Sequence, residues 1–223
     1  MTAANFDCDP LEHYPNRAEL AADGWVHGVG LAAALTGGGV LFAAALMREG
    51  VGQAAAVALY GVTLVVMLAC SAAYNFSRPS RARPYLRRMD QAAIFLLIAG
   101  SYTPFTTQRL DGAWAWGMTA LVWAVALGGV AGKLLTDRLS EKFWCGVYVA
   151  FGWIAVIAAK PLWEGVPPLA LGLLALGGAI YTAGVWLFLA KAIPYRRALW
   201  HGFVVVAAGV QQAAVWTGVV LAP

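Results

Sequence analysis

Charged residues are scarce in this chain. Aspartate, glutamate, lysine and arginine make up 12% of its 223 residues, whereas apolar residues make up 61%. Soluble domains carry about 25% charged residues, so this composition excludes an ordinary soluble protein. The mean hydropathy of +0.69 agrees with that exclusion. We therefore interpret the chain as an integral membrane protein.

Cysteine is also rare, and no secretion signal or nucleic-acid motif is present. The cysteines Cys8, Cys70 and Cys145 have unrelated spacings that fit neither a disulfide framework nor a CxxC metal site. No long basic run is present, which argues against nucleic acid as a partner. Residues 1–23 are polar and lack the apolar core of a signal peptide. We interpret them as a cytoplasmic N-terminal segment that precedes a transmembrane domain, residues 24–223.

Long apolar runs dominate the rest of the sequence, and each can cross a bilayer as a helix of about 20 residues. The runs are 24–46, 52–75, 89–108, 113–133, 142–161, 167–190 and 198–221. The connections between them are too short for a soluble domain. The predicted fold is therefore all-α, a single bundle of seven transmembrane helices.

The basic residues predict the orientation of this bundle. Of the 15 lysines and arginines, only Arg48, Arg109 and Lys160 fall on the side opposite the N-terminus. Cytoplasmic loops are enriched in lysine and arginine. We therefore expect a cytoplasmic N-terminus and, after seven crossings, a C-terminus outside.

Five polar residues share one predicted depth at the cytoplasmic ends of the helices. Ser71 and Asn75 are four residues apart at the end of the second span, and Asp90 opens the third. His27 lies one turn into the first span, and His201 lies at the start of the seventh. Polar groups at membrane depth usually face the bundle interior or a cavity, so this coincidence predicts a polar pocket.

Each of these residues also has a local explanation. Asp90 can cap its helix, and Asn75 can end the second span. His27 can hydrogen-bond Glu19 or Asp23, which share its helical face at a spacing of four. The predicted pocket depends on the residues occurring together rather than on any one of them.

A second set of polar residues lies deeper in the bilayer. These residues can line an interior pocket, although the serine and threonines near Pro104 can instead bond the backbone carbonyls that a helical proline frees. The set comprises Ser101, Tyr102, Thr103, Thr106, Gln211 and Gln212.

Three stretches carry a resemblance to a known family. They are SAAYN at 71–75, RRMDQAAIFLLIAGSYTPF at 87–105 and YRRALWHGFVVVAAG at 195–209. In these stretches the chain resembles the hemolysin III family, bacterial relatives of the progestin and adiponectin receptor family. The similarity extends from about Glu19 to the end. It implies seven spans, a cytoplasmic N-terminus and a multi-pass protein of the bacterial inner (plasma) membrane.

The resemblance also implies a site. Related membrane hydrolases combine a serine, an aspartate and three zinc-binding histidines, and Ser71 and Asp90 match the first two as candidate catalytic residues. His201 matches one metal ligand, but Asn75 and Arg197 occupy the other two ligand positions. Neither an amide nor an always-protonated guanidinium replaces an imidazole on zinc. We therefore expect no cofactor, and a metal-free cluster in which Asp90 pairs with Arg197.

One alternative stays open for the metal and two stay open for the function. His27 can join Asp90 and His201 in a residual metal site. The leading function is a hemolysin III-type protein that acts on or senses membrane lipids. The alternatives are a zinc-dependent hydrolase of lipid amide or ester bonds and a membrane-permeabilising haemolysin, so whether the protein is an enzyme stays open. The expected partners are membrane lipids, and a homo-oligomer is compatible with the sequence.

Overall fold

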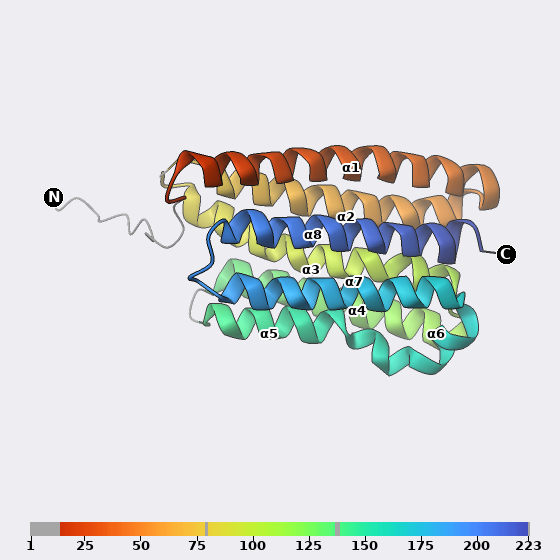
Figure 1. Cartoon of the computed structure of the whole chain (residues 1–223). Helices are drawn as coiled ribbons and strands as arrows, with labels where there is room; N and C mark the ends of the chain where they lie inside the picture. Colours follow the sequence, from red (N-terminus) through yellow and green to blue (C-terminus); the bar gives the residue numbers. More distant parts are fainter. Residues whose placement is uncertain (1–13, 79, 137–138, 223) are drawn as a thin grey trace.

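The computed structural model describes residues 14–78, 80–136 and 139–222, which form a bundle of long helices and no strand (Figure 1). Six helical segments of this part are long and apolar enough to cross a membrane, judged by length and composition. The elements are α1 (Arg17–Glu49), α2 (Val51–Asn75), α3 (Arg83–Gln108), α4 (Gly112–Leu135), α5 (Glu141–Gly152), η2 (Ile154–Ala158), α6 (Ala159–Gly165), α7 (Pro168–Leu189), α8 (Arg196–Val215) and η3 (Trp216–Val220).

The all-helical prediction is confirmed, and each predicted span coincides with a helical rod. Six rods meet the hydropathy criterion, and α5, η2 and α6 together make one of them, Glu141–Gly165. The predicted third span corresponds to α3. That helix is less apolar because its first turns carry charged residues, among them Arg87, Arg88 and Asp90.

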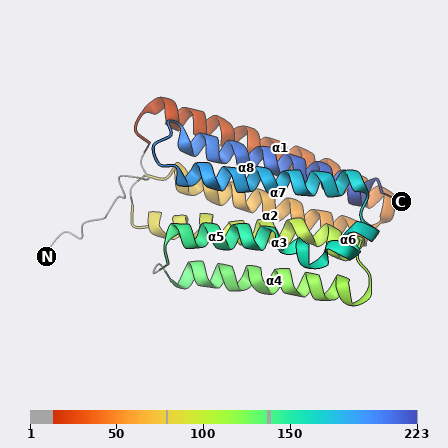
Figure 2. The same cartoon turned by 60° about the horizontal axis from the view of Figure 1, so that its bottom comes forward.

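The helices pack in an order that brings distant parts of the sequence together. Helix α1 packs along both α2 and α8, α8 packs along α7, and α3 lies between α2 and α4 (Figures 1 and 2). The first and last described residues lie at opposite ends of the bundle, as an odd number of crossings requires. The starts of α1 and α8 and the end of α2 meet at one end.

Helix α1 begins earlier than the apolar run predicts. Its N-cap is Asn16, whose side chain accepts a hydrogen bond of 2.9 Å from the backbone N–H of Glu19. An N-cap followed three residues later by glutamate is a capping box, which favours helix initiation. Because the helix starts at Arg17, Asp23 and His27 lie one above the other on the same helical face.

The fifth membrane-crossing rod is broken. After Gly152, the α-helix gives way to the short 3₁₀ helix η2. The Tyr102 hydroxyl on α3 donates to the Gly152 carbonyl at 2.7 Å and accepts from the Ala155 N–H at 3.0 Å. Backbone groups freed inside a membrane need such partners, so Tyr102 stabilises the break.

Candidate functional site

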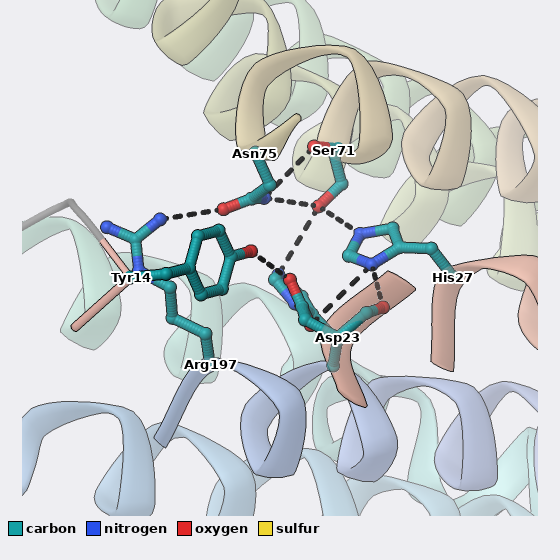
Figure 3. A network of polar contacts seen from close by, with 7 residues as sticks. Tyr14, Asp23, His27, Ser71, Asn75 and Arg197 are labelled. Atoms are coloured by element: carbon teal, nitrogen blue, oxygen red, sulfur yellow. Dashed lines mark hydrogen bonds and ion pairs between the residues drawn. The ribbon is translucent and has the colours of Figure 1, made fainter. Parts of the chain in front are cut away.

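A group of seven polar side chains lies where the ends of α1, α2 and α8 meet (Figure 3). We call it the polar cluster. Its members are Tyr14, Asp23, His27, Ser71, Asn75, Arg197 and His201. All but Tyr14 and Arg197 are buried, so their polar atoms depend on one another for hydrogen bonds.

Asp23 is the centre of the cluster and is completely buried. Its Oδ1 accepts from Nδ1 of His201 at 2.6 Å, and its Oδ2 accepts from the Tyr14 hydroxyl. Its backbone carbonyl lies 2.9 Å from Nδ1 of His27. Carboxylate and carbonyl oxygens can only accept, so Nδ1 carries the hydrogen in both imidazoles. Asp23 therefore sets the orientation and the tautomer of both rings.

Both imidazoles point their other nitrogen at the same hydroxyl. Nε2 of His27 lies 3.1 Å from Oγ of Ser71, and Nε2 of His201 lies 3.3 Å from it. The ring centroids are 4.4 Å apart. A neutral imidazole that is protonated on Nδ1 has a lone pair on Nε2, whereas a serine hydroxyl has one hydrogen. The hydroxyl can thus donate to only one of the two rings at a time.

Arg197 and Asn75 complete the cluster on the side of Tyr14 (Figure 3). Nη1 of Arg197 donates to Oδ1 of Asn75 at 2.9 Å, which fixes the orientation of the amide. Nδ2 of Asn75 then donates to the carbonyl oxygen of Ser71 at 2.9 Å and lies 3.3 Å from its Oγ. The Arg197 guanidinium lies over the Tyr14 ring, 5.2 Å from its centroid.

Tyr14 covers the cluster from the segment that precedes α1. Burial, and then the hydrogen bond to Asp23, raise the pKa of the Tyr14 phenol above its ordinary value. The phenol consequently stays protonated at neutral pH and keeps donating to Asp23. This contact supplies the second hydrogen bond to a carboxylate that has no access to water.

The ligand positions that the family resemblance implies do not fit zinc. The Asn75 amide and the Arg197 guanidinium are bonded to each other, and the guanidinium has no lone pair to offer a metal. A different set, Asp23, His27 and His201, offers ligand atoms that all lie within 4.8 Å of one another. These three residues are a possible metal site, and it differs from the predicted His27, Asp90 and His201.

The structure brings together most of the residues singled out in the sequence. Ser71, Asn75, Arg197 and His201 all join the cluster, as does His27. Their chemical roles stay predictions.

The carboxylate of the cluster is Asp23, whereas the sequence favoured Asp90. Asp90 is half-buried on α3. The physical reason is packing, since α1 runs along α8 over a much longer stretch than α3 does. The expected Asp90–Arg197 pair stays a prediction; Arg197 donates to Asn75 and lies over the ring of Tyr14.

Sequence reasoning considered Asp23 only as a local partner of His27 and did not consider Tyr14. The available signal was the capping box at Asn16 and Glu19, which places Asp23 inside the helix. The hydrogen bond that Asp23 accepts from His201 spans 178 positions and has no sequence signature of its own.

A separate apolar cavity of about 630 Å³ lies among α3, α5, α6, α7 and α8. Its wall is mostly aliphatic and aromatic, with a few polar groups. Ser101, Tyr102, Thr106 and Gln211 belong to the lining, as the deeper polar set predicted. Thr103 is not part of this lining and donates to the backbone carbonyl of Ala99 at 2.9 Å, one position before Gly100, whose carbonyl loses its helical donor to Pro104.

Comparison with known proteins identifies the family. Residues 19–212 match the family model described as Haemolysin-III related. Hemolysin-3 of Bacillus cereus is 30% identical over 186 residues, 83% of this chain and 85% of the relative. The Hemolysin-3 homolog of Bacillus subtilis (strain 168) is 33% identical over 146 residues, 66% of this chain and 68% of the relative. The human monocyte to macrophage differentiation factor is 26% identical over 212 residues, 91% of this chain and 85% of the relative. This multi-pass membrane protein therefore belongs to the hemolysin III family.

Proposed function

We propose that this protein binds the acyl chain of a membrane lipid and acts on or senses that lipid. The observation that carries this proposal is the apolar cavity of about 630 Å³ among the membrane-spanning helices. Small-molecule sites have volumes of about 300–1,000 Å³ and combine an apolar lining with a few polar groups. Lipid is the apolar molecule that surrounds a membrane protein, so an acyl chain is the natural occupant.

The orientation forms part of the same proposal. The excess of lysine and arginine beside the N-terminus supports a cytoplasmic N-terminus in a bacterial inner (plasma) membrane. The polar cluster would then face the cytoplasm at the end of the bundle, while the cavity lies deeper among the helices. A phosphatase fused to the C-terminus would be active under this orientation, because that end would lie outside.

Binding of radiolabelled palmitate to the purified protein tests the acyl-chain site. Ala175 on α7 lines the cavity, so Ala175→Phe should fill part of it and weaken binding by at least about tenfold. Leu176 is outside the lining and 50% exposed, so Leu176→Phe is the matched control and should bind like the wild type. Equal palmitate binding by the wild type and Ala175→Phe would refute the assignment of the cavity as the acyl-chain site.

A second candidate function is metal-dependent hydrolysis of a lipid amide or ester. The observation in its favour is the grouping of Asp23, His27 and His201. A bound divalent ion would supply a metal-activated water to such a site. Ligand atoms around tetrahedral zinc lie about 3.4 Å apart when the bonds are about 2.1 Å long. Oδ1 of Asp23 and Nδ1 of His201 are 2.6 Å apart as a hydrogen-bonded pair. Because the ion would have to break this bond, we favour the metal-free state.

The name Hemolysin-3 of the Bacillus relatives suggests a third candidate, membrane lysis. The most hydrophobic stretches of the six detected spans each contain at most two charged residues, whereas an ion path is usually lined by polar or charged groups. Dye-loaded vesicles that contain the purified protein should therefore hold their dye. Release that depends on the amount of protein would instead favour lysis.

A further inference from the structure

The geometry of the polar cluster points to a serine nucleophile: we infer that Asp23 and His201 activate Ser71 for acyl transfer from a lipid ester. This inference deepens the proposed lipid-directed function and takes its class of substrate from it. It assigns chemistry to the cluster that requires no metal ion. It also gives roles to Asn75 and Arg197, the two residues that replace zinc ligands.

The three groups stand in the order that nucleophilic catalysis requires. The Asp23 carboxylate holds Nδ1 of His201 at 2.6 Å, and Nε2 of the same ring lies 3.3 Å from Oγ of Ser71. Because Nδ1 carries the hydrogen, Nε2 presents its lone pair to the hydroxyl. A base held by a carboxylate within reach of a hydroxyl is the arrangement that activates serine nucleophiles.

Burial strengthens this arrangement. Asp23 is 0% exposed, Ser71 is 3% exposed and His201 is 9% exposed. Electrostatic interactions are stronger in such a low-dielectric setting than in water. A positive charge that develops on His201 as it takes the serine proton is therefore stabilised directly by the Asp23 carboxylate.

Two imidazoles approach Ser71, and their other partners decide which one is the stronger base. Nδ1 of His201 is bonded to a carboxylate oxygen, whereas Nδ1 of His27 is bonded to a neutral carbonyl and lies 3.6 Å from the same carboxylate. The closer carboxylate stabilises a protonated ring more. We assign His201 as the base and His27 as a positioning residue that holds the Ser71 hydroxyl from the other side.

Asn75, at one of the two substituted ligand positions, supplies a donor for a developing oxyanion, and Arg197, at the other, holds that amide in place. Nδ2 of Asn75 lies 3.3 Å from Oγ of Ser71, and Arg197 fixes the amide by donating to its Oδ1. When Oγ is bonded to an acyl carbon, the amide N–H lies close to that centre. A fixed donor of this kind stabilises negative charge that appears on the carbonyl oxygen.

The reaction then proceeds in two balanced steps. Oγ of Ser71 bonds to the ester carbonyl carbon while its proton passes to Nε2 of His201, and the alcohol leaves with that proton as the C–O bond breaks. Water next gives a proton to His201 and attacks the acyl-serine, releasing the fatty acid and returning the proton to Ser71. The net change is ester plus water to acid plus alcohol.

A long-chain fluorophosphonate tests the nucleophile in the full-length protein, with mass spectrometry locating the modified residue. We expect modification of Ser71 in the wild type, no loss of rate in the presence of a metal chelator, and no modification in Ser71→Ala. Ser77, near the same end of α2, donates to the carbonyl of Tyr74, and Ser77→Ala should react like the wild type. Loss of reaction with the chelator and recovery with added zinc would overturn the metal-free assignment.

The activating groups are tested by the rate of the same reaction. Asp23→Asn and His201→Gln should each slow modification of Ser71 by at least about 100-fold, whereas His27→Gln should slow it by less than about tenfold. A rate for Asp23→Asn within about twofold of the wild type would overturn the inference. Elution from a sizing column and palmitate binding verify that each variant is folded.

Palmitate binding also separates this inference from the proposed function. If the wild type binds palmitate but its Ser71 does not react with the fluorophosphonate, the serine chemistry is refuted and the lipid site stands. If Ser71 reacts while palmitate does not bind, the nucleophile stands and the acyl-chain site is refuted. An acyl-serine at position 71 after incubation with 4-nitrophenyl palmitate is the expected covalent product, and its absence would refute acyl transfer.

Discussion

Replacing Asp23 by alanine should destabilise the fold as well as disable the site. The carboxylate is completely buried and accepts hydrogen bonds from His201 and Tyr14. Alanine would leave Nδ1 of His201 buried without an acceptor and would remove the acceptor of the half-buried Tyr14 hydroxyl. The backbone carbonyl of residue 23 would still accept from His27. The substitution therefore removes only the two hydrogen bonds that the carboxylate accepts.

The size of the effect follows from those two donors. The buried His201 donor left without a partner costs about 1–3 kcal/mol, and the lost hydrogen bond of the half-buried Tyr14 costs about 0.5–1.5 kcal/mol. Asp23→Ala should therefore lower the free energy of unfolding by about 1.5–4.5 kcal/mol. Asp23→Asn keeps one acceptor oxygen, which can serve one of the two donors. We therefore expect it to cost about half as much.

Equilibrium unfolding in mixed detergent micelles, followed by tryptophan fluorescence, measures these differences. Arg17 lies in the first turn of the same helix and is exposed. Arg17→Ala is the matched control and should change the free energy of unfolding by no more than about 0.5 kcal/mol. An Asp23→Ala protein as stable as this control would refute the central position of the carboxylate.

Two further predictions concern helix packing and the lost ligands. A β-carbon at Gly129 would lie 2.4 Å from the buried ring of Phe95, so Gly129→Ala should cost about 1–3 kcal/mol. Gly128 has open space, so Gly128→Ala should be neutral or slightly stabilising in the same unfolding assay, and equal effects at the two positions would contradict this packing. The double variant Asn75→His/Arg197→His restores the ligand set implied by the family and should bind about one zinc per chain by elemental analysis; no gain of zinc would show that other residues also prevent binding.

Composition and hydropathy were enough to predict an all-helical bundle of membrane-crossing length. Seven apolar runs with short connections leave few arrangements for a chain that must satisfy its backbone inside a bilayer. The break after Gly152 could not be predicted, because the hydroxyl that stabilises it belongs to Tyr102, 50 positions away. Only packing of α3 against α5 brings those groups together.

The sequence predicted where polar side chains gather and most of the residues in that cluster, but not the acid among them. Ser71, Asn75, Arg197 and His201 share one depth because each lies near a helix end, which topology alone determines. Choosing between Asp23 and Asp90 requires knowing which helix packs along α8. That neighbour is α1, and hydropathy carries no information about such adjacency.

The metal content of the purified protein tests the central claim, that this cluster works through hydrogen bonds and proton transfer rather than through a bound ion. Mass spectrometry of the detergent-extracted wild type and of His201→Ala gives the number of zinc ions per chain. The relay of Asp23, His201 and Ser71 predicts less than about 0.1 zinc per chain in both proteins. Zinc near one per chain in the wild type, lost in His201→Ala, would contradict it and favour metal-dependent hydrolysis.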